Sequence, residues 1–164
     1  MSLASIQSRA LLGVDALAVT VETHLSNGLP AFAIVGLPET AVKESKERVR
    51  SAIINSGLEF PTRRITVNLA PADLPKAGGS YDLAIALSIL IASGQLERRM
   101  LENMEVLGEL ALDGSIRAVP GTVCAILAAK RQANKILLPA ANTQELNVVA
   151  YRHSYSSSSL SELC

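Results

Sequence analysis

Aromatic residues are scarce in this chain of 164 residues, at 3% of the total, with no tryptophan, two phenylalanines and three tyrosines. A hydrophobic core must therefore consist mainly of leucine, isoleucine, valine and alanine, the bulk of a hydrophobic content of 49%. A chain of this length buries roughly 68–70% of its unfolded surface. It can form one domain without a disulfide or a structural metal.

Cysteine is scarce, and the sequence has no excess of either charge. Cys124 and Cys164 lie far apart, which indicates no disulfide framework and favours a reducing cytoplasm. His24 and His153 are separated from both cysteines, so we expect no metal site. Lysine and arginine number 15 and so do aspartate and glutamate, so binding to DNA would need a local patch or an oligomeric ring.

Long apolar runs are also missing. The longest, Leu83–Ala92, falls far short of the roughly 20 residues that a membrane span needs. The N-terminus carries no basic segment followed by an apolar region, so we expect no secretion signal. The sequence thus predicts a cytoplasmic protein without a membrane contact.

Strand and helix patterns alternate along the chain. Predicted strands lie at 3–12, 14–25, 31–35, 65–69, 105–112, 115–119, 135–138 and 148–150, and predicted helices at 39–56, 81–92, 122–133 and 140–146. Gly57 is placed to end the first helix, and Asp113-Gly114 is a strong hairpin signal. This order predicts an α/β (α+β) fold, a mixed β-sheet with packed helices.

Serine dominates the end of the sequence from Ser154 onward. Serine-rich segments are typical of flexible linkers. We therefore predict one domain over 1–152, followed at 153–164 by a linker or by the start of another unit.

The most basic region surrounds the first predicted helix. It contains Lys43, Lys46, Arg48, Arg50, Arg63 and Arg64. These side chains are either the solvated face of a helix or a surface that contacts phosphates or another subunit.

Ser80 is the one candidate catalytic residue. It follows a loop with two prolines and two glycines and precedes the apolar run of 81–92. Its hydroxyl could cap that helix. It could instead act as a nucleophile, with the backbone N–H groups of Gly78 and Gly79 stabilising an oxyanion, provided that a base removes its proton.

The segment Pro75-Lys-Ala-Gly-Gly-Ser80 resembles the stretch around the nucleophile of Lon-type proteases, and Val119-Pro-Gly121 resembles their later motif. The resemblance implies a fold like the Lon proteolytic domain and ribosomal protein S5 domain 2, with a Ser–Lys dyad. The position of the catalytic lysine falls on Val123, which cannot act as a base. Two substitutes are conceivable: Lys130, two helical turns further on, and Lys76, which we expect to be exposed and protonated.

A closer resemblance covers nearly the whole chain. The segments Val35-Gly-Leu-Pro-Glu39, Glu47–Gly57 and Ile65–Lys76 are similar to the N-terminal domain of the Mg-chelatase-like AAA+ ATPases, the YifB/ComM family. This resemblance implies a Lon-like domain in front of an AAA+ motor, and family members of the ComM type act as hexameric ATP-driven helicases in branch migration during natural transformation. Its expected partners are its own AAA+ module, further copies of itself and DNA.

The chain has no Gly-x-x-x-x-Gly-Lys-[Ser/Thr] phosphate loop. We therefore expect no cofactor in this domain, with ATP and Mg²⁺ bound by an ATPase module that this chain does not include. The leading hypothesis is a non-catalytic domain that supports ring assembly and contacts DNA or a partner. The alternative is a Lon-like serine hydrolase that uses Ser80 with an atypical base, and a third possibility, a regulatory subunit of a metal chelatase, lacks a ligand cluster.

Overall fold

Seven strands form one mixed sheet in the order β3-β4-β2-β1-β5-β8-β9, and β6 and β7 form a separate ribbon. The computed structural model describes residues 2–164. The strands are β1 (Leu3–Leu12), β2 (Asp15–Ser26), β3 (Ala31–Val35), β4 (Arg64–Ala70), β5 (Met104–Val106), β6 (Glu109–Leu110), β7 (Ile116–Arg117), β8 (Lys135–Pro139) and β9 (Ser154–Ser157). In the main sheet, the β1–β2 and β2–β4 pairs are antiparallel and the others are parallel. The predicted mixed α/β class is confirmed.

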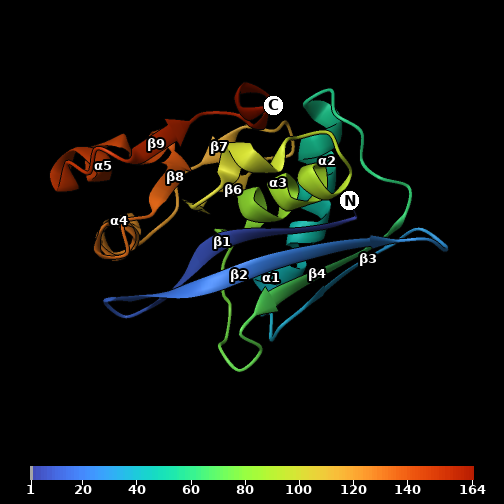
Figure 1. Ribbon diagram of the computed structural model, residues 1–164, viewed down its shortest axis with the longest axis horizontal. Helices are drawn as coiled ribbons and strands as arrows, with labels where there is room; N and C mark the ends of the chain where they lie inside the picture. Colours follow the sequence, from blue (N-terminus) through green and yellow to red (C-terminus); the bar gives the residue numbers. More distant parts are fainter. Residues whose placement is uncertain (1) are drawn as a thin grey trace.

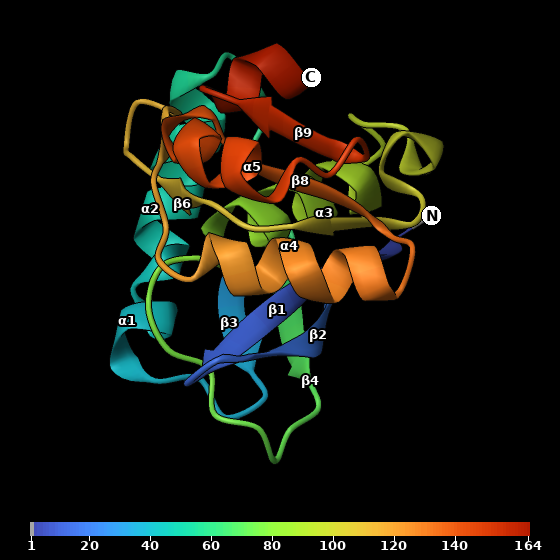
Figure 2. The same ribbon diagram turned by 90° about the vertical axis from the view of Figure 1, so that its left-hand side faces the viewer.

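The helices are α1 (Thr40–Lys43), α2 (Ser45–Asn55), α3 (Asp82–Ala92), α4 (Thr122–Arg131) and α5 (Thr143–Val149). Figure 1 shows α2 and α3 on the same side of the sheet formed by β1, β2 and β4. Figure 2 shows α4 running across β1 in front of the sheet, and α4 lies close to both β1 and β2.

Helix α3 is the centre of the core. Every one of its residues is buried, as expected for a helix that is apolar on all sides. Its one internal hydroxyl, Ser88 Oγ, lies 2.6 Å from Thr23 Oγ1 of β2 and also donates to the carbonyl of Ile85. The polar group is thus satisfied inside the core, and it fixes α3 on the sheet.

A buried ion pair joins the two halves of the sheet. Arg9 of β1 donates from Nε and Nη2 to the two carboxylate oxygens of Glu105 of β5, at 2.8 and 2.6 Å, and both side chains are 3% exposed. Gln132 accepts a further bond from Arg9, and Asn134 donates to Glu105. Nothing in the sequence pattern indicated this pair, because its members lie 96 positions apart.

Three of the predicted helices and strands are wrong in part or in whole. The helix predicted at 39–56 is divided at Glu44 into α1 and α2, at the point where the buried side chain of Ser45 turns toward the core. The strand predicted at 148–150 is instead the end of α5, which stops where Ala150 takes a left-handed conformation with φ of 52°. The predicted strand 105–112 is also two elements, β5 in the main sheet and β6 in the ribbon.

The segment 153–164, predicted as a linker or as the start of another unit, is not a free linker for most of its length. Ser154–Ser157 forms β9, which pairs in parallel with β8, and Leu160 is fully buried in the main core. The serine hydroxyls are satisfied locally, since Ser157 and Ser158 both donate to the carboxylate of Glu162. A polar composition that indicates a linker can therefore also form an edge strand, when its side chains bond one another. The predicted limit of the domain at 152 stays a prediction.

Within residues 2–164 the longest helices have 11 residues, and none is long and apolar enough to cross a membrane.

Replacing Arg9 by methionine should lower the free energy of unfolding by about 3–5 kcal/mol, because it leaves the buried carboxylate of Glu105 without its cation. Urea unfolding at neutral pH measures the loss. The double variant Arg9→Met/Glu105→Leu is the matched control and should recover most of it, since an apolar pair leaves no buried charge. A double variant no more stable than Arg9→Met would contradict this account of the pair.

Candidate functional site

A pocket of about 300 Å³ lies beside Ser80. Its lining comes from the end of β1, the loop before α3 and the segments that flank the ribbon: Ala10, Leu11, Leu12, Glu39, Pro75, Ala77, Gly78, Gly79, Ser80, Tyr81, Glu109, Val119 and Pro120. The loop that carries Ser80 is held in place by its backbone. Gly108 N–H donates to the carbonyl of Ser80 at 2.9 Å, and the carbonyl of Gly108 accepts from Leu83 N–H at 3.0 Å.

Ser80 does not cap α3, so this prediction is wrong. Tyr81 occupies the N-cap position, and no side chain makes a capping hydrogen bond there. The helix begins one residue later than a serine cap requires. The half-buried Ser80 therefore lines the pocket without serving the helix end.

Neither of the two conceivable substitute bases, Lys130 and Lys76, lines this pocket. Val123, at the Lon lysine position, is a half-buried residue of α4, and Lys130 is exposed on the same helix. Among the described residues that line the pocket there is no lysine, arginine or histidine. Its titratable side chains beside Ser80 are the carboxylates of Glu39 and Glu109 and the phenol of Tyr81, which sequence reasoning had missed. An ordinary carboxylate is too weak a base to deprotonate a serine hydroxyl by itself.

Lys76 is buried, with a relative exposure of 0%, so the prediction that it is exposed is wrong. Its Nζ donates to the carbonyl of Gly36 at 2.6 Å and also to that of Pro71. Burial lowers the pKa of Lys76, and the charge of Asp73 opposes this effect. Both carbonyls need the ammonium protons, so Lys76 ties two loops together and is not a base for Ser80.

Glycine is required at the loop that Lys76 holds. A Cβ on Gly36, whose φ is +102°, would lie 2.1 Å from the carbonyl oxygen of Leu69. The backbone can therefore approach β4 only because this residue has no side chain.

The predicted basic residues do not form one surface. Arg48 points inward and meets the fully buried carboxylate of Asp82, with Nε 2.6 Å from Oδ2. Ser45 Oγ and the backbone N–H of Leu110 also donate to this carboxylate, at 2.5 and 3.1 Å. Asp82, at the first turn of α3, therefore joins α2, α3 and β6.

Burial raises the pKa of Asp82, while the hydrogen bonds from Arg48 and Ser45, the charge of Arg48 and the Leu110 N–H oppose this rise. The hydrogen bond to Asp82 in turn raises the pKa of Arg48. Arg48 is thus held by the internal structure, and its predicted contact with DNA or a partner stays a prediction.

Two further arginines lie together beside the two phenylalanines. The guanidinium carbon of Arg50 is 5.2 Å from the ring centroid of Phe60, which is 5.8 Å from that of Phe32. Arg63 donates to the carbonyl of Leu25 at 3.3 Å and lines the same pocket as these rings.

The other three predicted contact residues face outward at two places. Lys43 is exposed at the end of α1 and Lys46 is half-buried one turn later in α2. Arg64 is exposed at the start of β4, where it pairs with Ala31. The structure thus divides the six residues into Arg48 in an ion pair, Arg50 and Arg63 at an aromatic pocket, and a remaining set that is exposed or half-buried.

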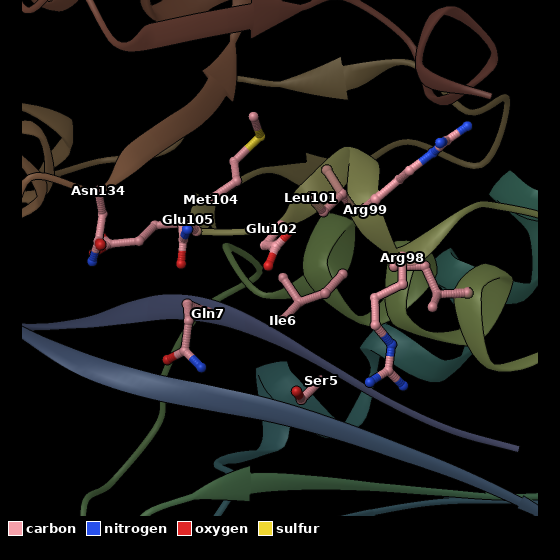
Figure 3. A pocket seen from close by; sticks show the side chains of 12 residues that line it. Ser5, Ile6, Gln7, Arg98, Arg99, Leu101, Glu102, Met104, Glu105 and Asn134 are labelled. Atoms are coloured by element: carbon pink, nitrogen blue, oxygen red, sulfur yellow. The ribbon is translucent and has the colours of Figure 1, made fainter. Parts of the chain in front are cut away.

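A second pocket, of about 480 Å³, lies between β1 and β5 and is shown in Figure 3. Side chains of both charges surround it, among them Arg98, Glu102 and Glu105. Glu105 is already bonded to Arg9 and Asn134, and Arg98 donates to the carbonyl of Leu3 at 2.6 Å. Two of these charged groups, Arg98 and Glu105, are therefore engaged with the protein itself.

Comparison with known proteins gives one family match. The family described as subunit ChlI of Mg-chelatase matches residues 21–142. Over all 164 residues the chain is 51% identical to the uncharacterized protein YifB of Salmonella typhimurium, and it spans 32% of that protein. It is also 51% identical over 155 residues to the competence protein ComM of Haemophilus influenzae, covering 94% of this chain and 30% of ComM.

A more distant similarity supports the predicted fold. The chain is 26% identical over 134 residues to the Lon protease of Clostridioides difficile, covering 77% of this chain and 17% of the protease. The mixed sheet with packed helices agrees with the predicted Lon-like fold. The curated relatives of higher identity are about three times as long as this chain.

Replacing Arg48 by methionine should lower the free energy of unfolding by about 3 kcal/mol at pH 7, because the buried carboxylate of Asp82 loses its cation. The loss should shrink as the pH falls toward about 4, the pKa of an aspartate in the unfolded chain. In the variant, burial raises the pKa of Asp82 in the folded protein, and Arg48 no longer opposes this rise. The free energy of unfolding of the variant therefore falls as the pH rises above the pKa of the unfolded chain. Urea unfolding of both proteins across this pH range measures the difference.

The matched control is Lys46→Met on the same helix, which should change stability by no more than about 0.5 kcal/mol. A deficit of Arg48→Met that is the same at pH 4 and pH 7 would argue against the ionised carboxylate as its cause.

A fluorophosphonate probe should not label the folded protein, because the pocket supplies no basic side chain to activate Ser80. The measurement is mass spectrometry of the intact protein after incubation with the probe. Labelling of the wild type that disappears in Ser80→Ala would show a working nucleophile and overturn this interpretation.

Proposed function

This chain belongs to the family of subunit ChlI of Mg-chelatase, and from that premise we propose that it serves as a non-catalytic domain of a ring-forming ATPase. In this role it supports the contacts between subunits and contacts DNA during ATP-driven branch migration. The name of the competence protein ComM, 51% identical to it, supports a role in competence. ATP and Mg²⁺ would bind in the part of such a protein that lies outside this chain.

The observation that carries the non-catalytic role is the pocket at Ser80. It keeps a loop similar to that of Lon proteases but, among its described lining residues, has no basic side chain. A serine hydrolase needs such a group or an equivalent base to activate the hydroxyl. No contact of Ser80 favours the hydrolase alternative.

A projecting hairpin supports the proposed subunit contact. Figure 1 shows the turn between β1 and β2 extending beyond the body of the molecule. Its apolar side chains are open to solvent: Val14 is 85% exposed, and Leu12 and Leu17 are exposed as well. Apolar groups gathered at one exposed site are typical of protein–protein contacts.

The proposed DNA contact rests on the outward-facing part of the basic set. Lys43 and Lys46 are one helical turn apart and can contact consecutive phosphates, and Arg64 adds a third charge elsewhere on the surface. Arg48 is left out of the DNA contact because Asp82 holds it.

One experiment tests both parts of the proposal. Sedimentation velocity of the 164-residue protein is recorded over a range of protein concentrations, with and without a fluorescent branched DNA oligonucleotide. Val14→Asp should reduce self-association, since a charge disrupts an apolar contact. The double variant Lys43→Glu/Lys46→Glu should weaken DNA binding and lower the slope of log K against log salt by roughly 1 for each lysine.

Each variant serves as the control for the other, and Lys130→Glu on α4 controls for a general change in charge. Self-association unaffected by Val14→Asp would remove the hairpin from the proposed contact. DNA affinity that falls equally in Lys130→Glu would remove the specific role of Lys43 and Lys46.

A further inference from the structure

The strand β3 leaves one edge of the main sheet open. It is the terminal strand of the sheet, and within residues 2–164 it pairs only with β4, from Ala31↔Arg64 to Val35↔Asn68. Ala31 N–H donates toward the carbonyl of Arg63, on the β4 side. Because successive N–H groups of a strand point to opposite sides, those of Phe32 and Ile34 face the open edge.

The open strand carries none of the features that usually protect a sheet edge. All five of its residues are apolar, with no charged side chain and no proline within Ala31–Val35. Exposed apolar residues flank it, since Leu29 is 87% and Leu37 53% exposed. Natural edge strands avoid unwanted pairing through lysines, prolines or bulges. An unprotected edge of this kind is suited to pairing with another strand.

A pocket of about 340 Å³ lies at the beginning of this strand. It is lined by Pro30, Ala31, Phe32, Arg50, Phe60, Pro61, Thr62 and Arg63, and so contains both phenylalanines of the chain. It is large enough for one apolar side chain of a bound segment, and its rings and prolines provide apolar contact.

The charges at this pocket are of one sign. Arg50 and Arg63 are its charged lining residues, and none of the described lining residues is acidic. The nearby Glu59 lines an adjoining pocket that shares Pro61, Thr62 and Arg63 with this one, and Gln95 donates to its backbone carbonyl. A ligand with a carboxylate next to its apolar side chain therefore complements the pocket.

We propose that the open edge of β3 and the adjacent Phe32–Phe60 pocket bind an extended acidic peptide segment of a partner protein. The segment adds a strand to β3 through the N–H groups of Phe32 and Ile34. It places an apolar side chain in the pocket and a carboxylate against Arg50 or Arg63. This mode of recognition takes affinity from main-chain hydrogen bonds and specificity from alternate side chains.

A peptide fits these observations better than a nucleic acid strand does. Stacking of a base needs a free aromatic face. Arg50 lies over the ring of Phe60, and Phe32 packs against it with an interplanar angle of 33°. The free N–H and C=O groups of the strand edge, in contrast, are the partners that an added β-strand requires, and stacking of a base does not use them. The inference does not depend on the proposed DNA contact, which uses other residues.

The probe is a fluorescent seven-residue peptide that alternates valine or leucine with two glutamates. Fluorescence anisotropy with the 164-residue protein should detect binding, and the amide signals of Phe32 and Ile34 should shift in ¹H–¹⁵N spectra. A peptide with proline at its centre should bind at least tenfold more weakly, because it cannot donate to the strand edge.

Charge reversal tests the pocket. Arg50→Glu should weaken binding of the acidic peptide about tenfold and strengthen binding of a matched peptide with lysines in place of the glutamates. A misfolded variant would bind neither peptide, so stronger binding of the lysine peptide shows that Arg50→Glu is folded and has lost only the charge contact. The variant Arg117→Glu on β7 is the control for total charge.

Binding of the acidic peptide weaker than about 1 mM would overturn the proposal. So would binding without shifts at Phe32 and Ile34, or equal binding of the proline peptide. A single-stranded oligonucleotide that displaces the acidic peptide, and whose binding depends on Phe32 and Phe60, would show that the pocket is a nucleic acid site and not a peptide site.

Discussion

The buried carboxylate of Asp82 is the interaction on which the rest of this structure depends. It accepts hydrogen bonds from Arg48, Ser45 and the backbone of Leu110, so one side chain fixes α2, the start of α3 and β6 relative to one another. A carboxylate without exposure is costly to bury unless its partners are in place. Because Asp82 is in the first turn of α3, its position determines where the loop that carries Ser80 ends. The ion pair with Asp82 also explains why Arg48 points toward the interior.

The Ser80 pocket combines a loop fixed by its backbone with a lining that, among the described residues, has no basic side chain. The loop is fixed by Lys76 from one side and by Gly108 from the other, so the serine is held next to a pocket. The lysine that a Lon-type mechanism needs is replaced by Val123, and the nearby Lys76 is used to bind carbonyl groups. The fold is thus Lon-like, and Lys76 serves structure within it.

Two exposed apolar sites on the surface are the places where we propose contacts with other proteins. The β1–β2 hairpin exposes apolar side chains at one end, and the β3 edge with its phenylalanine pocket lies at another. These sites are separated along the sheet, since β3 is its terminal strand and β1 lies near its centre. The proposed subunit contact and the proposed peptide site therefore use different parts of the sheet.

The sequence by itself determined the local elements and the family. The apolar run of α3, Gly57 after α2 and Asp113-Gly114 between β6 and β7 are local patterns, and they predicted these elements to within a few residues. It also determined that the Lon lysine is missing, because Val123 can be identified by its spacing from Gly121. Only the tertiary structure decided what the polar residues do. Arg48, Lys76 and Arg9 look like surface charges in the sequence, yet each is held by groups at least five positions away, at Asp82, Pro71 and Glu105. Likewise, the serine-rich composition of the last segment predicts a linker, and only the fold shows that Ser154–Ser157 pairs with β8. Hydrophobic periodicity is a local property of the chain, whereas the partner of a buried charge depends on distant segments brought together by folding.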